Sequence, residues 1–566
     1  MFLSAVKSPR QYGVTVSRFL GIDARKRCED GAFAQMKNLC GDAYPALTTR
    51  RPRSAVTTLT SGGGLVMKDA LCWVDGTKLY INDLETGLTL SPGKKQLISM
   101  GAYLIVWPDK VYVNTADMSQ YGSLENQVSF TGEAETCLCD EQGTEYHDYA
   151  SPSAPAEPEQ GALWLDEDHV LHRWDGSLWQ ETVSYVKLEA TGIGVGFRTG
   201  DGVSVQGMAA LEGQYLIKCC ADNALVLSGS WNTLGTEQTT LTVERQVPDM
   251  DFVVECNNRL WGCKYGMVGG KAVNEIYASA LGDFCNFHTY AGLSTDAYAA
   301  QRGSDGPFTG AISFLGNPLF FKENGLEKVY VSATGAHQIV YTPCPGVAPG
   351  SGGSLQVVDS SLYYLGTGGI YRYDGAMPVK ISEALGEEKF HGGVAGGKEG
   401  KYYLSALNEA DEPVLLCYHT ALRRWYQEDD LRAVAFAASE GELYCLDEDG
   451  VIWALCGSEG TPESGELLWS ADTGDWGLDD PEHKYLTRLD LRCQAEKGAV
   501  VTVFVSYDGG RHYHREGQLR GTGGITPQRL TIRPRRAPQI RLRFQGKGEC
   551  TIFSLRAVYD KGSDVV

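Results

Sequence analysis

The chain has 566 residues, of which 43% are hydrophobic and 68 are glycine, and its formal net charge is −21. Glycine at about 12%, against an ordinary share of roughly 7%, indicates many turns in a folded chain. So negative a charge excludes a bulk role in wrapping nucleic acid or coating an anionic membrane. No apolar run is long enough to span a membrane, and no signal peptide is evident, so we expect a chain assembled in a cytoplasm with reduced cysteines.

Residues 1–60 differ from the rest of the chain in charge and in pattern. Residues 1–53 carry ten Lys and Arg side chains against four Asp and Glu. The segment has few periodic strands, but it has many apolar side chains of the kind that anchor one surface on another. We therefore predict an extended N-terminal arm over residues 1–60 that lies on a more acidic body.

From about residue 65 the sequence becomes a series of short apolar runs separated by Asp-Gly, Asn-Gly and Gly-Gly turns, which is typical of β-hairpins. In the later half these hairpins recur about every 40 residues, starting near Pro318, Ser361, Tyr402 and Glu442. A period of this length indicates the blades of a β-propeller. We predict five to seven blades, divided between residues 61–130 and 249–480.

Residues 131–248 interrupt the propeller. They contain a Pro-rich stretch over 151–158, and the sequence has no Lys or Arg from Val111 to His172. We predict an acidic linker followed by a small inserted β domain. The glycines at 192–196 precede another turn and strand, so they do not predict a phosphate-binding loop.

Residues 481–566 predict a C-terminal cap that resembles a β-sandwich, with five strands and tight turns. Its clearest motif fits the Asp-box of sialidase-like propellers, in which Ser and Asp stabilise a hairpin turn; the matching residues are Ser506, Asp508, Gly510 and Tyr513. The cap also carries a candidate basic interface for an acidic neighbour or phosphate, formed by Arg533, Arg535, Arg536, Arg541 and Arg543. The predicted fold class is thus all-β, a propeller with an arm, an insertion and a cap.

No sequence pattern anchors catalysis. HExxH, GxSxG, Walker and paired zinc-ligand motifs are all missing from the sequence. We therefore expect no catalytic residue, no cofactor, no metal site and no enzymatic activity.

Taken in order, these features resemble the tail nozzle, tail-hub and packaged-DNA-stabilisation proteins of short-tailed bacteriophages. The arm contributes residues 19–23, 36–39 and 44–51, the propeller contributes its hairpins, and residues 473–478 and 484–489 contribute the approach to the cap.

This resemblance implies a structural virion protein of the neck or tail that forms a homo-oligomeric ring, commonly a hexamer, below the portal and adaptor. It implies contact with neck proteins and tail fibres, transient non-specific passage of double-stranded DNA, and no membrane. Acidic stretches such as 428–430 would then keep DNA from sticking to a channel. The arm residues that would anchor the chain to its neighbours are Phe19, Asn38, Tyr44, Pro45, Arg50 and Arg51. Removing residues 1–53 would leave a folded propeller unable to join them.

Two other functions remain open. The first is a glycan-binding propeller of a tail fibre or baseplate, whose exposed Trp and Tyr stack on sugars. The second is a sialidase-like glycoside hydrolase.

Overall fold

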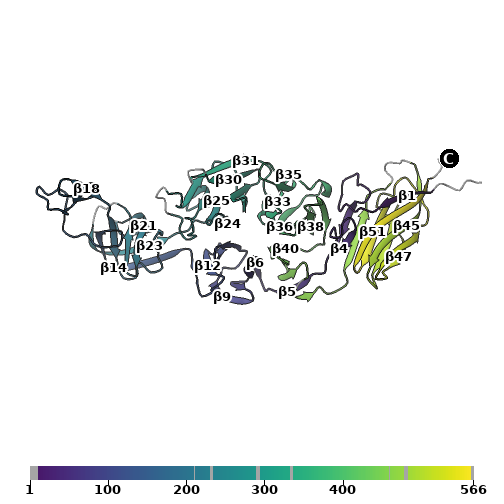
Figure 1. Cartoon of the computed structure of the whole chain (residues 1–566), viewed down its shortest axis with the longest axis horizontal. Helices are drawn as coiled ribbons and strands as arrows, with labels where there is room; N and C mark the ends of the chain where they lie inside the picture. Colours follow the sequence, from purple (N-terminus) through teal and green to yellow (C-terminus); the bar gives the residue numbers. More distant parts are fainter. Residues whose placement is uncertain are drawn as a thin grey trace, which may run out of the picture.

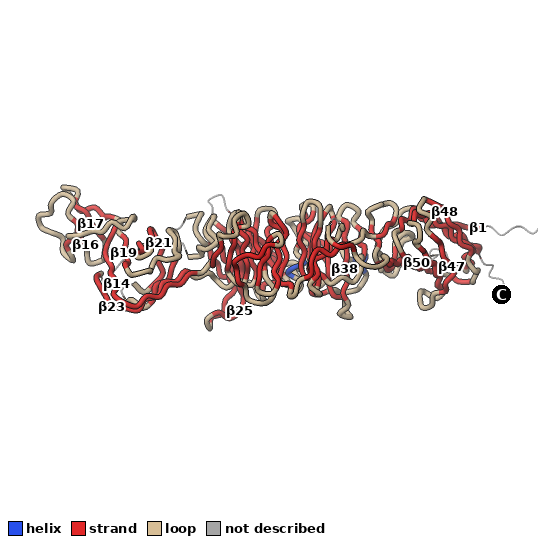
Figure 2. The backbone as a smooth tube through the Cα atoms, turned by 90° about the horizontal axis from the view of Figure 1, so that it is seen from below, coloured by secondary structure: helices blue, strands red, loops and turns tan. Residues whose placement is uncertain are grey.

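The computed structural model describes residues 11–561 except 210, 230–233, 289–292, 332–335, 458 and 477–481. The described chain is an elongated, flat row of three parts: an inserted domain at one end, a propeller in the middle and a sandwich at the other end (Figures 1 and 2). It is almost entirely strand, with two short 3-10 helices at Gly352–Ser354 and Glu383–Leu385. The described residues include no helix that is long and apolar enough to cross a membrane.

Seven antiparallel sheets form the propeller; six are meanders of four strands, and the seventh has five strands. Blades one and two are β6 (Gly62–Lys68), β7 (Ala70–Asp75), β8 (Lys78–Ile81) and β9 (Leu84–Thr89), then β10 (Gln96–Met100), β11 (Tyr103–Trp107), β12 (Val111–Asn114) and β13 (Tyr121–Ser123). Blades three and four are β24 (Phe252–Glu255), β25 (Leu260–Val268), β26 (Lys271–Ala278) and β27 (Tyr298–Gln301), then β28 (Phe308–Phe314), β29 (Asn317–Lys322), β30 (Gly325–Val331) and β31 (His337–Pro343).

Blades five and six are β32 (Gln356–Val358), β33 (Ser361–Gly366), β34 (Gly369–Tyr373) and β35 (Val379–Lys380), then β36 (His391–Lys398), β37 (Lys401–Leu407), β38 (Pro413–His419) and β39 (Arg424–Gln427). Blade seven is β40 (Ala433–Ala438), β41 (Leu443–Asp447), β42 (Val451–Ala454) and, from far upstream, β5 (Ser54–Thr58), which also pairs with β43 (Thr461–Pro462). The prediction of an all-β propeller with five to seven blades is confirmed, and the number is seven.

The 40-residue repeat in the sequence marks the second strand of each blade. The four hairpin starts near Pro318, Ser361, Tyr402 and Glu442 fall at β29, β33, β37 and β41. These second strands are buried on both faces between neighbouring blades, so they read as nearly continuous apolar runs. The first strands line the axis in a ring: neighbouring first strands contact each other around it, and between β28 and β36 the 3-10 turn Gly352–Ser354 contacts both strands. Pairing of β5 with β42 closes the ring between the first and last blades.

The insertion lies between blades two and three. A closed six-stranded barrel contains β14 (Asn126–Cys139), β19 (Tyr185–Glu189), β22 (Ala224–Leu227), β21 (Gly213–Ala221), β20 (Gly202–Gln206) and β23 (Gly235–Arg245). Between β14 and β19 a separate sheet forms from β15 (Tyr149–Ala150), β16 (Leu163–Leu165), β17 (Leu171–Trp174) and β18 (Trp179–Thr182). We call residues 149–182 the tip, because they lie at the free end of the molecule (Figure 1).

Two sheets make the C-terminal sandwich, and the N-terminal arm contributes strands to both. One contains β3 (Leu39–Cys40), β4 (Leu47–Thr49), β51 (Cys550–Lys561), β45 (Lys484–Ala495), β48 (Ile525–Thr531), β1 (Gln11–Val16) and β49 (Arg536–Ala537). The other contains β2 (Phe33–Lys37), β44 (Leu468–Thr473), β50 (Arg541–Lys547), β46 (Val500–Ser506) and β47 (His514–Arg520). Residues 477 and 478, which contribute to the family resemblance, lie outside the described residues.

The arm is therefore part of the sandwich core and does not lie extended on a finished surface. Phe19, Phe33, Met36, Leu39 and Leu47 are buried together with sandwich and propeller side chains. β2 pairs with β44, and β1 and β4 both pair with β51. The sequence pattern did not show this because β2, β3 and β4 are only two to five residues long.

A buried ionic cluster joins the arm to blade six at the start of β5. The Arg53 guanidinium is almost fully buried and donates to Glu428 at 2.8 Å and to Asp429 at 2.7 Å. Burial alone would lower the pKa of Arg53, but these two carboxylates raise it above its ordinary value. Burial raises the pKa of Asp429, and Arg53 and Arg50 more than offset this, so the net shift is downward. Glu428 and Asp429, which would repel DNA if they lined a channel, are buried ion-pair partners of Arg53.

Arg53→Ala is expected to lower the free energy of unfolding by about 3–5 kcal/mol, because it leaves buried Glu428 without its counter-ion and buried Asp429 with Arg50 alone, at 3.6 Å. Because the folded pKa of Asp429 is depressed, the stability it contributes is present above its unfolded pKa of about 3.9 and is lost as the pH falls through the folded value. Arg53→Ala should therefore also flatten the loss of stability on acidification. Urea unfolding across acid pH measures both effects. Arg51→Ala, an exposed neighbour, is the control, and a loss no larger than that of Arg51→Ala would contradict the prediction.

Candidate functional site

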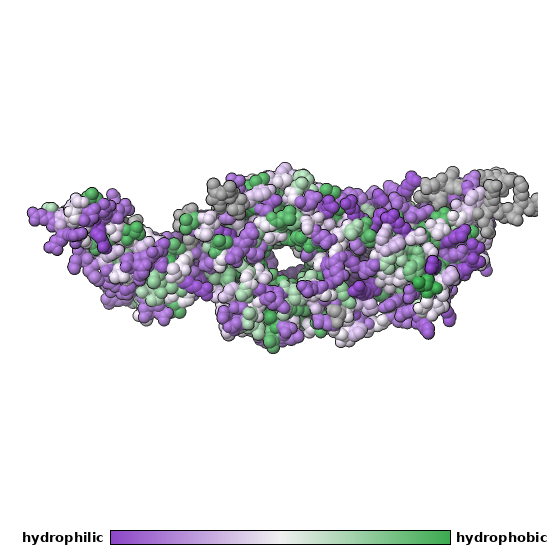
Figure 3. All heavy atoms as spheres, viewed as in Figure 1, coloured by the Kyte–Doolittle hydropathy of each residue, from purple (hydrophilic) through white to green (hydrophobic). Residues whose placement is uncertain are grey.

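The propeller axis is open through the middle of the molecule, as Figure 3 shows. The seven first strands, which are fully described, carry four ionisable side chains: Lys68, Glu255, His391 and Lys398. Glu255 accepts from the Asn258 backbone N–H, and each lysine donates to a carbonyl in a neighbouring blade. Hydrolysis of a glycosidic bond ordinarily needs two carboxylates on either side of it, and these seven strands supply one.

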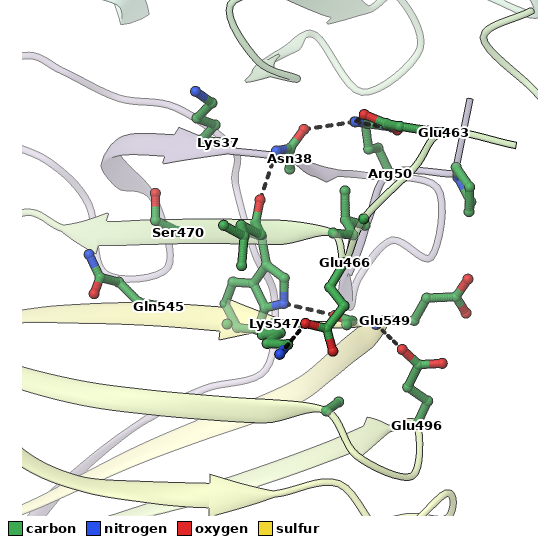
Figure 4. Close-up of a pocket in the computed structure, with 18 of the residues that line it drawn as sticks. Lys37, Asn38, Arg50, Glu463, Glu466, Ser470, Glu496, Gln545, Lys547 and Glu549 are labelled. Carbon is green, nitrogen blue, oxygen red and sulfur yellow. Dashed lines mark hydrogen bonds and ion pairs between the residues drawn. The ribbon is translucent and has the colours of Figure 1, made fainter. Parts of the chain in front are cut away.

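A polar cleft of about 880 Å³ lies where the propeller meets the sandwich (Figure 4). Three ion pairs join charged side chains of its lining: Arg50 with Glu463 at 3.0 Å, Lys37 with Asp430 at 3.0 Å, and Lys547 with Glu466. Asn38 donates to the Leu468 carbonyl at 2.7 Å and accepts from Arg50 at 2.7 Å. Lys37 and Arg50 thus tie the arm to the propeller side of the cleft, and Asn38 ties it to β44 of the sandwich. Among the described residues, no group of three or more His, Cys, Asp or Glu side chains is arranged to hold a metal ion.

The predicted arm anchors lie at this same junction and contact their own chain. Phe19 stacks on Phe33 with ring centroids 6.1 Å apart, and Tyr44 contacts Arg18. Asn38 and Arg50 are buried in the network just described, while Pro45 and Arg51 are exposed. Of the six predicted anchors, Phe19, Asn38 and Arg50 are therefore not available to a neighbour, because their own chain covers them.

The Asp-box residues form the turn between β46 and β47. The Ser506 hydroxyl donates to Asp508 at 2.8 Å and accepts from the Gly510 N–H at 2.9 Å. Asp508 also accepts from the backbone N–H of His512 at 3.0 Å, and this bond leads the causes that lower its pKa. The Tyr513 ring lies 3.9 Å from the Arg543 guanidinium carbon. These contacts hold a hairpin turn.

The predicted basic interface is divided by the structure. Arg541 forms a bidentate ion pair with Asp475, at 2.6 and 2.9 Å, and Arg543 pairs with Asp472 at 2.6 Å. Hydrogen bonds to these partners raise the pKa of both arginines. The two side chains are therefore neutralised within the chain, which corrects their assignment to an interface.

Arg533, Arg535 and Arg536 are exposed, and further arginines lie near them on β47, β48 and the adjoining turn. Residues 509–536 hold seven Arg and one carboxylate, Glu516. β47 and β48 are the edge strands of the two sheets and contact each other. We call this exposed set the basic edge; it consists of Arg511, Arg515, Arg520, Arg529, Arg533, Arg535 and Arg536, of which Arg529 pairs with Asp490 at 2.9 Å. Sequence reasoning missed the first four because it considered only the arginines clustered after residue 532.

Three tryptophans gather on one face of the tip sheet. Trp164 pairs across the sheet with His172, and Trp174 pairs with Trp179, so strand pairing places all four on the same face. The Trp179 ring centroid lies 5.5 Å from that of Trp164 and 5.4 Å from that of Trp174. Trp164 stacks on His172 at 4.7 Å. We call these four rings, with Glu181 opposite His172, the Trp face.

The two faces of the tip sheet have different environments. Leu163, Leu165 and Leu171 alternate with the Trp-face residues and pack into the barrel core. The three tryptophans on the other face are partly exposed. Leu178, in the turn before Trp179, is 50% exposed, and Val183 after β18 is 70% exposed. An aromatic and apolar patch therefore remains at the surface at the end of the molecule, and patches of this kind mark binding sites.

Sequence reasoning missed the Trp face because it looked for sugar-stacking aromatics in the blades. The signal was present, since three of the eleven tryptophans fall between residues 164 and 179. Trp164 is also fixed by its indole N–H, which donates to the Pro152 carbonyl at 2.7 Å. His172 contacts Asp166 at 2.7 Å.

Comparison with known proteins gave matches among solved structures alone. No family model matches the chain, and no curated protein matches its sequence. The chain is similar to the exo-β-1,3-galactanase of Phanerochaete chrysosporium, at 9% identity and a TM-score of 0.23, over 54% of this chain and 94% of that one. It is also similar to the Trypanosoma rangeli sialidase, at 10% identity and a TM-score of 0.23, over 67% and 90% of the two chains.

A third match is a family 43 arabinoxylan arabinofuranohydrolase of Bacillus subtilis, at 10% identity and a TM-score of 0.15, over 55% of this chain and 95% of that one. These matches contradict the prediction that the chain is not an enzyme, and that prediction is withdrawn. The sequence identities and TM-scores are too low to transfer an activity, a substrate or a site residue from these proteins to this chain.

Proposed function

We propose that this chain is a glycan-binding protein of a bacteriophage tail, and that it binds sugar on the Trp face of the tip. The observation that carries the proposal is the gathering of three partly exposed indole rings on the outer face of one small sheet. The C–H faces of a pyranose ring are apolar and flat, so they stack on aromatic rings. Trp supplies a large apolar surface together with an N–H donor at its rim.

The surroundings of the Trp face suit a sugar in two further ways. Sugar hydroxyls need hydrogen-bonding groups beside the apolar surface, and His172 and Glu181 lie on the same face as the rings. The tip is also held away from the propeller by the long β14 and β23 pair, so it reaches beyond the bulk of the chain (Figure 1). The bacteriophage part of the proposal rests on the resemblance in the arm and the order of the domains.

A glycan microarray probed with the full chain tests the binding function. We expect binding to a subset of hexose or hexosamine glycans, and loss of that binding when residues 149–182 are replaced by a short Gly-Ser linker. The tip strands pair only with one another, so this replacement leaves the propeller and sandwich sheets whole. Binding that persists without the tip would refute the assignment to the Trp face. Mass spectrometry of density-purified particles from the source culture separately tests the place in a virion.

We propose as a second candidate function that copies of the chain form a ring in a phage neck or tail. The supporting observation is that the two ends of the molecule carry opposite charge. Residues 126–182, from β14 through the tip, contain thirteen carboxylates and a single Lys or Arg, Arg173, whereas the basic edge lies at the far end, on the sandwich (Figure 1). An acidic end and a basic end favour head-to-tail contact between copies, which closes a ring when the rotation allows it.

A charge reversal of the basic edge tests this contact. Arg515→Glu combined with Arg520→Glu and Arg533→Glu is expected to shift an oligomer to monomer in light scattering at low salt. High salt should dissociate the unaltered chain, because these exposed charges are screened. Lys380→Glu, an exposed change on blade five, is the control. An oligomer that neither salt nor the triple variant disturbs would contradict the head-to-tail arrangement.

A further inference from the structure

We infer that the Trp face selects glycans that carry a positively charged amino sugar over glycans of acidic sugars. This inference rests on the proposed glycan-binding function and names the class of ligand for the same site. It follows from the distribution of charge over the tip.

The tip is strongly acidic, and its single cation is placed away from the aromatic rings. Residues 149–182 contain seven carboxylates and one basic side chain, Arg173. Arg173 pairs with Leu163 and Gln180 across the sheet, so it lies on the face opposite the tryptophans. His172 lies against Asp166 at 2.7 Å, which places a further carboxylate beside the imidazole ring of the Trp face.

Glu181 brings a carboxylate onto the Trp face itself. It is exposed, lies directly across from His172, and is two residues from Trp179 on the same side of β18. A sugar ring stacked on Trp179 therefore meets a carboxylate at its edge. An ammonium group on that ring would gain an ion pair with Glu181 and a cation–π contact with the indoles. A carboxylate on the ring would instead meet the like charge of Glu181, and the one Arg of the tip, Arg173, lies on the other face.

Calorimetric titration of the full chain with three tetrasaccharides tests the selection. The probes are β-1,4-linked glucosamine, β-1,4-linked N-acetylglucosamine and galacturonic acid. At mildly acidic pH and low salt we expect glucosamine to bind about three- to tenfold more tightly than N-acetylglucosamine, which corresponds to one or two exposed charge contacts. Galacturonic acid should bind at least about tenfold more weakly than glucosamine. High salt should reduce both differences toward parity.

Two variants separate the charge effect from folding. Glu181→Gln is expected to remove most of the preference for glucosamine and to leave N-acetylglucosamine affinity within about twofold. Glu237→Gln, an exposed carboxylate on the barrel strand β23, should change neither. Equal affinity for glucosamine and N-acetylglucosamine, or preferred binding of galacturonic acid, would overturn the selection while leaving glycan binding intact. Binding to none of the three, together with a blank microarray, would remove the proposed function itself.

Discussion

Removal of residues 1–53 is expected to unfold the C-terminal sandwich while the seven blades remain paired. The segment supplies β1, β2 and β4, which pair with β44 or β51, and β3, which pairs with β4. It also buries Phe19, Phe33, Met36, Leu39 and Leu47 in the shared core. β5 lies beyond the deletion, so the pairing that closes the propeller is retained. The structure therefore replaces the expectation from sequence, in which the truncated chain loses only its contacts with neighbours.

The size of the effect follows from the core side chains alone. Each fully buried Phe, Met or Leu contributes about 1.5–3 kcal/mol, so five of them amount to roughly 10 kcal/mol. That is comparable to the whole stability of an ordinary domain, about 5–15 kcal/mol. The deletion also uncovers the edges of β44 and β51, which would then be free to pair with other chains.

Hydrogen exchange of the truncated chain measures this directly. Amides of β46 and β50 should lose their protection, whereas those of β33 and β37 in blades five and six should keep it. Adding residues 1–53 back as a separate peptide should restore protection in the sandwich. The chain lacking the tip is the matched control, because that deletion removes strands that pair only with each other. Full protection of β46 and β50 after truncation would show that the arm is dispensable to the sandwich.

The propeller could be predicted because its evidence is local and repeated. Each blade's second strand is a run of buried residues followed by a tight turn, as in the segment from Leu362 to Gly369, and the same pattern recurs four times at nearly constant spacing. Periodic burial and turn chemistry are properties of short segments, so the sequence alone carries them. Closure by β5 is not local, since Thr58 pairs with Val451, and no short segment encodes that partner.

Contacts between residues that are far apart in the sequence explain the other differences between the predictions and the structure. The spacing of Arg541 and Arg543 on a strand correctly places them on one face, but their neutralisation depends on Asp472 and Asp475 from the adjacent strand and its end. In the sequence, Phe19 is equally compatible with anchoring a neighbouring chain and with packing in its own core. Only the pairing of β2 with β44, which brings the arm into the sandwich, distinguishes the two. Trp164 and Trp179 become neighbours through two hairpin turns that were predicted only as a loosely defined insertion.

Trp179→Ala is expected to raise the dissociation constant for the bound glycan about 10- to 100-fold. Trp179 is the central ring of the Trp face, since it contacts both Trp164 and Trp174. Loss of a large aromatic surface from a contact costs about 1.5–3 kcal/mol, and each 1.4 kcal/mol is a factor of ten in affinity. Because the ring is partly exposed and lies outside the barrel core, the thermal unfolding of the propeller and sandwich should not change.

Two further variants make the result specific to the stacked ring. Trp179→Phe keeps an aromatic surface and should recover part of the affinity, whereas a role in folding alone would predict no link between ring size and binding. Tyr265→Ala removes an exposed aromatic from blade three and should leave the dissociation constant unchanged. Calorimetric titration with the best glycan from the microarray gives all four constants. If Trp179→Ala binds as tightly as the unaltered chain while its fold is intact, the sugar does not stack on this ring, and the binding surface must be sought elsewhere on the tip.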